Sequence, residues 1–180
     1  GQLQPHESIL ITGIGGGVAT IALKMAHASG ARVVVSSSSD EKLARAISLG
    51  ASAGVNYTGE NWAERFLSEH GRLDLILDGA AGGDFGALLP LVRPGGRVVS
   101  YGGTAGPSVT FPIRYHFWNQ LQLIGSTMGS PSDFADMISF VEKHELRPEI
   151  DSVTPLEEGA NLISSMARSP QFGKLVLQIS

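Results

Sequence analysis

Four glycines near the start of the chain could bind an anion through the backbone. Gly13, Gly15, Gly16 and Gly17 fall within five positions, directly after the apolar run of residues 8–12. A strand, a glycine loop and a helix in this order bring several unpaired N–H groups to one point, where the helix dipole also favours negative charge. Glycine permits positive φ and lets a diphosphate approach the main chain closely. The stretch therefore predicts a phosphate-binding turn.

The glycine spacing matches a dinucleotide fingerprint only in part. Gly13 and Gly15 fit the first two places of G-x-G-x-x-G, but Val18 stands at the third. In a second alignment Gly13, Gly16 and Ala19 are spaced by three, and the small Ala19 would let the helix lie close to the sheet. No Lys-Ser or Lys-Thr pair follows, so a nucleoside-triphosphate loop is excluded. A tight turn that binds nothing is the alternative.

Hydroxyl groups follow the second apolar run, where NAD-binding proteins place an Asp or Glu for the ribose. Here Ser36, Ser37 and Ser38 occupy that place, and Asp40 comes later. A carboxylate would repel a 2′-phosphate, whereas a hydroxyl can donate to it, and Lys42 could add charge-assisted hydrogen bonds. This pattern favours NADP(H), with NAD(H) as the alternative.

Alternating strand and helix patterns would bring these residues to one edge of a sheet. Strands separated by helices imply parallel crossover units, with helices on both faces of the sheet. Ser38 is expected to cap the second helix, with Glu41 as its partner. We expect strands over residues 8–12, 31–36, 53–56, 73–78, 97–101 and 121–127, and helices over residues 17–29, 40–49, 61–70 and 84–92.

The last fifty residues have a different pattern. Ser130 and Asp133 have capping-box spacing, with Pro131 at the first helical position. A similar start signal at residues 154–157 predicts a second helix to about Arg168, and a final strand follows over residues 172–179. We therefore expect two parts, residues 1–130 and residues 131–180.

Composition excludes several classes of function. The chain has 180 residues, a net charge of −4 and scattered basic residues, which argues against a nucleic acid partner. No apolar run has the length of a membrane span. The absence of cysteine removes thiolate zinc sites and favours a reducing, cytoplasmic location. The five histidines share no metal-ligand spacing, so no metal is expected in this chain.

Several motifs together resemble one family. The segment ITGIGGGVA at residues 11–19 resembles the cofactor loop of medium-chain dehydrogenases/reductases, which include zinc-type alcohol dehydrogenases and zinc-free quinone and enoyl reductases. Further pieces that resemble this family are SSDEK, LGA, VNY, RPGGR, GSTMG, PLEE and QFGK, at residues 38–42, 49–51, 55–57, 93–97, 125–129, 155–158 and 171–174.

The resemblance implies an α/β fold, a Rossmann-type doubly wound parallel sheet of about six strands in the order 3-2-1-4-5-6, with a C-terminal helix-helix-strand appendage. It implies the NADP(H)-binding domain of an oxidoreductase that transfers a hydride between the nicotinamide and a carbonyl, alcohol, quinone or enone. Family members carry a separate catalytic domain, which we expect to be missing here, so no catalytic residue is assigned. A homodimer through the edge strand at residues 121–127 is also implied.

Twenty residues are the expected cofactor contacts. They lie in the glycine loop, at the ends of strands two to six and, for one lysine, in the helix after strand two. These residues are Gly13, Gly15, Gly16, Gly17, Val18, Ala19, Ser36, Ser37, Ser38, Lys42, Tyr57, Asp78, Gly79, Ala80, Gly102, Gly103, Thr104, Ser126, Thr127 and Met128. For Asp78, contact with a ribose and a purely structural role at the strand end are equal alternatives.

Two other functions fit parts of the pattern. A SAM-dependent methyltransferase shares the parallel sheet and the early glycine loop, but it usually needs an acid at the end of strand two. A non-enzymatic nucleotide-binding or assembly module is the second alternative, since the chain lacks an evident catalytic set. Measuring the binding of SAM and of NADPH distinguishes a methyltransferase from an oxidoreductase domain. Measuring turnover by the chain tests the non-enzymatic alternative.

Overall fold

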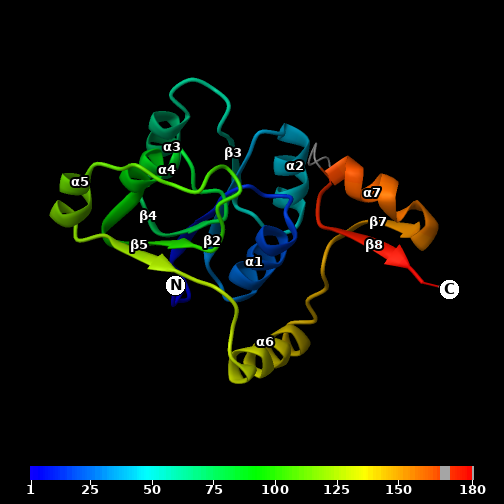
Figure 1. The fold of residues 1–180 in the computed structure, drawn as a ribbon. Coiled ribbons are helices and arrows are strands. Elements are labelled where there is room, and N and C mark those ends of the chain that lie inside the picture. The colour runs from blue at the N-terminus through cyan, green and yellow to red at the C-terminus, as the bar shows by residue number, and fades with distance from the viewer. Residues whose placement is uncertain (167–170, 180) are drawn as a thin grey trace.

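Six parallel strands form the central sheet in the order β3-β2-β1-β4-β5-β6, which confirms the predicted topology (Figure 1). The structure is a computed structural model that describes residues 1–166 and 171–179. A second sheet pairs β7 with β8 in parallel beside the main unit. The strands are β1 Ser8–Ile11, β2 Arg32–Ser37, β3 Ala53–Asn56, β4 Leu73–Asp78, β5 Val92–Ser100, β6 Gln122–Gly125, β7 Ile150–Pro155 and β8 Lys174–Gln178.

Helices connect most of the strands. Within the described part of the chain, none of them combines the length and the apolar character needed to cross a bilayer. The α-helices are α1 Gly17–Ala28, α2 Asp40–Ser48, α3 Trp62–His70, α4 Phe85–Leu88, α5 Ile113–Trp118, α6 Pro131–Lys143 and α7 Gly159–Met166, and the 3₁₀ turns are η1 Leu89–Leu91 and η2 Leu156–Glu158.

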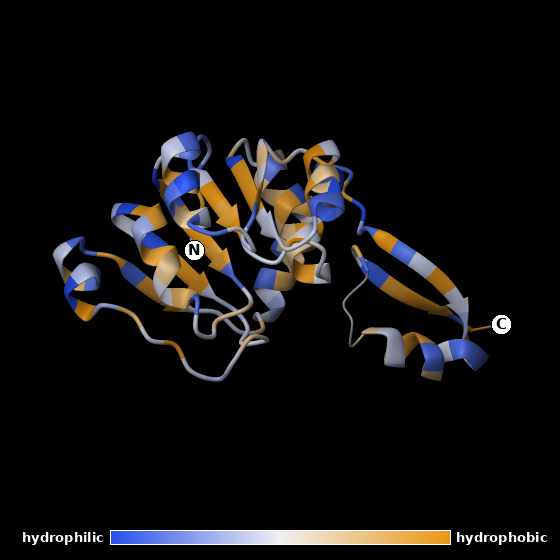
Figure 2. Cartoon of the chain, turned by 90° about the horizontal axis from the view of Figure 1, so that it is seen from above, coloured by the Kyte–Doolittle hydropathy of each residue, from blue (hydrophilic) through white to orange (hydrophobic). Residues whose placement is uncertain are grey.

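Two apolar cores lie on opposite faces of the sheet, because successive strand residues point to opposite sides. Ile9 and Ile11 belong to the core under α1 and α2, together with Leu23. Leu10, between them, belongs to the other core, with Phe66 of α3 and residues around α4. Figure 2 shows the apolar strands enclosed between helices whose outer surfaces are more polar. The buried strands hold the loops at their carboxyl ends in fixed positions.

Several predicted boundaries in the second half of the main unit are wrong. The expected helix 84–92 is only the short α4 followed by η1, because Pro90 in the 3₁₀ turn lacks the N–H that a continuing helix needs. Strand β5 then begins at Val92 instead of residue 97, and its pairing with β4 is irregular near Leu73. Helix α5 was not predicted, and β6 is shorter than residues 121–127.

The C-terminal segment contains one strand more than predicted, because β7 precedes the second helix and pairs with β8. The capping box of Ser130 and Asp133 is confirmed, with the Ser130 side chain accepting from the Asp133 N–H. The second helix begins as η2 and continues as α7, and its predicted end near Arg168 lies outside the described residues. The predicted cap Ser38 is wrong, because Ser39 caps α2.

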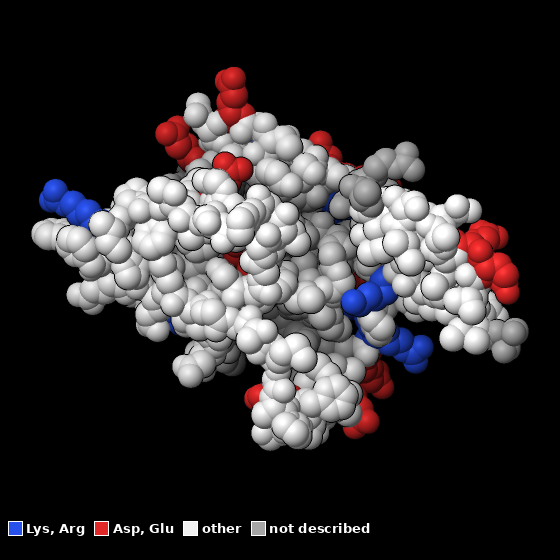
Figure 3. Space-filling model, viewed as in Figure 1, with Lys and Arg blue, Asp and Glu red and all other residues white. Residues whose placement is uncertain are grey.

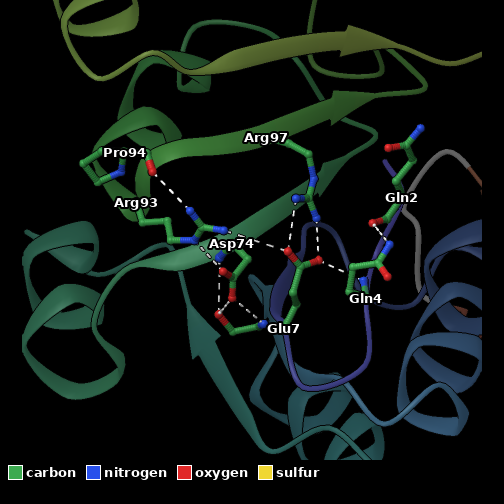
Figure 4. Close-up of polar contacts among 8 residues, drawn as sticks. Gln2, Gln4, Glu7, Asp74, Arg93, Pro94 and Arg97 are labelled. Carbon is green, nitrogen blue, oxygen red and sulfur yellow. Dashed lines mark hydrogen bonds and ion pairs between the residues drawn. The ribbon is translucent and has the colours of Figure 1, made fainter.

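A network of charges ties the first residues to the amino end of the sheet (Figure 4). The Arg97 guanidinium donates to both carboxylate oxygens of Glu7, at 3.1 and 2.5 Å. Asp74 accepts from the Ser8 N–H at 2.7 Å and from Arg93 Nε at 2.5 Å. Burial acts to raise the pKa of Asp74, but the hydrogen bonds from Ser8 and Arg93 outweigh it and lower the pKa to about 2.

We predict that Asp74→Asn lowers the free energy of unfolding at pH 7 by about 1–2 kcal/mol, since part of the carboxylate remains exposed to solvent. The folded pKa lies below the ordinary value of 3.8, so this stabilisation is present above about pH 4 and is lost as the pH falls towards 2. Urea unfolding at several pH values measures it. The exposed carboxylate variant Asp136→Asn is the control, and a pH-independent difference between Asp74→Asn and the unaltered chain contradicts the assignment.

Candidate functional site

The glycine loop connects β1 to α1 at the carboxyl edge of the sheet. Gly13 and Gly15 have φ of +63° and +119°, a conformation that side chains disfavour. The Ile14 N–H donates to the Ser36 carbonyl at 2.8 Å, which fastens the loop to the end of β2. Gly16 is the N-cap of α1 and provides no side-chain cap, and the first turn contains no acidic residue. The first N–H groups of α1 therefore have no intrahelical acceptor and point towards the loop.

Two lysine side chains lie against this loop from different parts of the chain. A Cβ at Gly15 would lie 3.0 Å from Cδ and 3.3 Å from Nζ of Lys42. A Cβ at Gly17 would lie 2.6 Å from Nζ of Lys174, so the lysine side chain would have to move aside to admit it. The glycines thus make room for two ammonium groups beside the N-terminus of α1. Lys174 was missed as a site residue, and the only sequence signal for it was the family-like QFGK segment.

A pocket of about 140 Å³ lies next to the glycine loop, at the carboxyl ends of β1, β2 and β4. It brings together five predicted residues, namely Gly13, Ser36, Tyr57, Asp78 and Ala80. Seven further lining residues are not among the twenty. Some lie on or beside α3 and α4, which pack over the edge, and the others are sequence neighbours of predicted residues. These seven are Thr12, Trp62, Ala81, Asp84, Phe85, Leu88 and Ala105.

The serine residues at the end of β2 differ in their surroundings. Ser36 and Ser37 are buried, whereas Ser38 is exposed. The Ser37 hydroxyl accepts from the Ser39 N–H at 3.1 Å, so it helps to turn the chain into α2. Asp40 accepts from the Asn56 side chain at 2.8 Å at the start of that helix. Ser36 lines the pocket, and Asp40 does not.

Asp78 is buried and hydrogen-bonded to its own surroundings. Its carboxylate accepts from the Thr12 hydroxyl at 2.6 Å and from the Ala81 N–H at 2.9 Å. These bonds join the ends of β1 and β4 and favour the structural alternative for Asp78. Burial, and then the negative charge of Asp78, raise the pKa of Tyr101 in the adjacent strand end.

The loops after β4 and β5 contact each other. The Thr104 hydroxyl donates to the Gly79 carbonyl at 3.4 Å, and a Cβ at Gly102 would lie 2.7 Å from the same oxygen. Gly103 belongs to this turn and accepts from the Gly106 N–H at 3.2 Å. These residues adjoin the pocket through Ala105, whose N–H donates to the Ala80 carbonyl at 2.8 Å.

The remaining predicted residues lie farther from the pocket. Ser126, Thr127 and Met128 follow β6 and are exposed, with Met128 96% accessible. They do not line the pocket. Val18 is half exposed on α1, whereas Ala19 is buried in the core under that helix, as its small side chain predicts.

Positively charged side chains lie beside the glycine loop. Figure 3 shows Lys and Arg side chains gathered where the β7-β8 unit meets the main sheet unit. Within residues 1–166 and 171–179, no three His, Asp or Glu side chains are placed to hold a metal ion together. The arrangement suits a phosphorylated ligand that spans from the loop into the apolar pocket.

Comparison with known proteins gives a consistent result. The family model described as zinc-binding dehydrogenase matches residues 17–143. The zinc-type alcohol dehydrogenase-like protein YogA of Leptosphaeria maculans is 38% identical, over 99% of this chain and 52% of that protein. The NADP-dependent alcohol dehydrogenase C 1 of Mycolicibacterium smegmatis is 34% identical, over 84% of this chain and 42% of that protein.

A solved structure of an NAD-dependent alcohol dehydrogenase superposes on the chain with a TM-score of 0.87 and 32% identity. The match covers 98% of this chain and 52% of that one. The chain thus spans about half the length of the relatives it matches.

We predict different outcomes for alanine at two loop glycines. Gly13→Ala should lower the free energy of unfolding by about 1–2 kcal/mol, because the positive φ disfavours a side chain although space is available. Gly17→Ala should cost less, since its new methyl meets only the mobile end of Lys174. Urea unfolding compares the two variants, and equal or reversed costs contradict this interpretation of the loop.

Proposed function

Because the chain belongs to the zinc-binding dehydrogenase family of medium-chain dehydrogenases/reductases, we propose that it binds a nicotinamide dinucleotide as the cofactor half of an oxidoreductase. The observation that carries this proposal is the glycine loop, where the uncapped start of α1 and two lysines surround one point. A diphosphate fits that point because it would accept from the N–H groups at the start of α1 and pair with the Lys174 ammonium group.

The pocket beside the loop supports a place for the adenosine half. Its apolar walls come from Trp62, Phe85 and Leu88, and such walls suit a flat aromatic base. Ser36 and Tyr57 line the side nearest to β2 and β3, where the adenosine ribose would follow. The nicotinamide half would then extend along the loops after β4, β5 and β6.

We propose NADP(H) as the preferred cofactor. The end of β2 carries serines, and Asp40 is engaged by Asn56 outside the pocket, so a 2′-phosphate would meet no lining carboxylate at this strand end. Lys42 lies one turn into α2 beside Gly15 and would attract that phosphate. The relatives include proteins named for NADP and for NAD, so this preference rests on the local residues.

Within such an oxidoreductase, the nicotinamide ring supplies or accepts the hydride when bound, and the protein positions it. This chain would fix the diphosphate and adenosine and would leave the ring at the open carboxyl edge. The groups that orient a carbonyl, alcohol, quinone or enone substrate would come from the part of the relatives that the chain does not span.

We also propose that two copies pair through β6. Among the described residues, β5 is the one neighbour of this strand in its sheet, and Gln122, Leu123 and Gly125 on it are exposed. An exposed edge offers unpaired N–H and C=O groups to a second copy. The adjacent α5 carries further apolar surface, with Phe117 and Trp118 59% and 72% accessible.

The pairing proposal predicts that Leu123→Lys converts a dimer into a monomer, since two added charges would oppose each other across the edge. Sedimentation velocity of the chain measures this change. Ile138→Lys on α6 is the control and should leave the dimer intact. A chain that is monomeric before any substitution contradicts the proposal.

The cofactor proposal predicts that the chain binds NADPH more tightly than NADH. Replacing Lys42 with alanine should narrow this difference about tenfold, equivalent to ~1.4 kcal/mol, because one charged contact to the 2′-phosphate is lost. Calorimetric titration with both cofactors measures the four dissociation constants. Lys143→Ala at the end of α6 is the matched control, and SAM is the negative ligand.

Three outcomes contradict the proposal in different ways. Tighter binding of NADH by the unaltered chain would refute the NADP(H) preference alone. Binding of SAM without either dinucleotide would favour a methyltransferase-like domain. Absence of dinucleotide binding by a folded chain would refute the proposed function as a whole.

A further inference from the structure

Glu149 lies in the segment between α6 and β7 and joins it to the two helices behind the glycine loop. One carboxylate oxygen pairs with the Lys24 ammonium of α1, and the other lies 3.2 Å from an Arg45 nitrogen of α2. Lys24 also donates to the Arg147 carbonyl at 2.8 Å. The Lys24 and Glu149 side chains are each only 17% accessible. The hydrogen bond from Lys24 is the main cause that lowers the pKa of Glu149, so the carboxylate is charged at neutral pH.

The backbone of Glu149 is hydrogen-bonded to Lys174, the lysine whose side chain lies beside the start of α1. Its carbonyl accepts from the Lys174 N–H at 2.8 Å, and the preceding Gly173 N–H donates to the Gly15 carbonyl, also at 2.8 Å. Gly173 has φ of +106°, and a Cβ there would collide with the Glu149 carbonyl. Two backbone hydrogen bonds, through the adjacent residues Gly173 and Lys174, therefore link Glu149 to the glycine loop.

Phe172 anchors the same series on its other side. Its side chain is buried in the core under α1 and α2, and its N–H donates to Asp151 at 2.8 Å. The Arg45 guanidinium that pairs with Glu149 also lies over the Phe172 ring, 4.6 Å from its centre. Arg45 thus contacts Glu149, just before β7, and Phe172, shortly before β8. The negative charge of Glu149 holds the guanidinium in this position.

We propose that Glu149 is a positioning residue, whose ion pairs with Lys24 and Arg45 hold residues 172–174 on the glycine loop and so seat the Lys174 ammonium beside the diphosphate site. The inference rests on the proposed function for the identity of the ligand. Glu149 does not line the pocket or the loop, so it acts through Lys174. Without the Glu149 carboxylate, Lys24 and Arg45 would no longer hold the segment in place. Lys174 would still be present, but its side chain would be positioned less firmly beside the loop.

A double-mutant cycle on the full chain tests whether Glu149 acts through Lys174. Glu149→Gln and Lys174→Met should each weaken NADPH binding about tenfold, and the double variant should bind no more weakly than Lys174→Met alone. Glu142→Gln on exposed α6 should bind as the unaltered chain does. If the two losses of affinity multiply, so that the double variant binds NADPH about a hundredfold more weakly than the unaltered chain, the proposal is overturned. An unchanged affinity in Glu149→Gln would also overturn it.

Hydrogen exchange without cofactor separates this proposal from the proposed function. In Glu149→Gln the amides of Gly173 and Lys174 should exchange at least tenfold faster, while the amides of β1 stay protected and show that the sheet remains folded. Lys24→Met, which breaks the same pair from α1, should give the same result. Unchanged exchange at both amides overturns the positioning role even if NADPH binds, and faster exchange without any NADPH binding refutes only the proposed function.

Discussion

The close approach of Lys174 to Gly17 is the contact on which the site depends. The absence of a Cβ at Gly17, the first residue of α1, lets the Lys174 side chain come this close without moving aside. The contact places a positive side chain from the C-terminal segment where the helix already offers unpaired N–H groups and the positive end of its dipole. Without this contact the loop would be an ordinary strand–helix turn with a single lysine, Lys42, beside it.

The two apolar cores fix the position of the glycine loop, and so of the contact between Lys174 and Gly17. Strand β1 is buried on both faces, through Ile9 and Ile11 on one side and Leu10 on the other. The glycine loop therefore begins from a backbone that is fixed by packing, and Asp78 ties its base to β4 through Thr12. A site built on a rigid strand end can hold a ligand phosphate with little reorganisation on binding.

The parallel strands, the helices between them and the glycine loop could be predicted because each has a local signal, such as the β-branched run of β2 or the glycines after β1. The strand order came from the family resemblance. The failures have physical reasons. Pro90 shortened a helix whose apolar spacing continued, and Ser39 displaced Ser38 as a cap by one residue. Trp62 and Phe85 reach the site through tertiary packing, which no local pattern encodes. Lys174 does so too, and the family-like QFGK segment was its one sequence signal. Met128 is exposed at the end of β6, and its expected contact with the nicotinamide half stays a prediction.

The bond from Gly173 to Gly15 has a consequence for the order of assembly during synthesis. The parallel sheet pairs no strand beyond β6, so its strands can assemble while the later segment is still being made, and Phe172 joins the core under α1 and α2 afterwards. Residues 172–174 leave the ribosome last among the groups that contact the loop. The nascent chain would thus form its sheet before it can bind a ligand tightly. A chain whose translation stops before residue 172 would have a folded sheet and bind the ligand weakly.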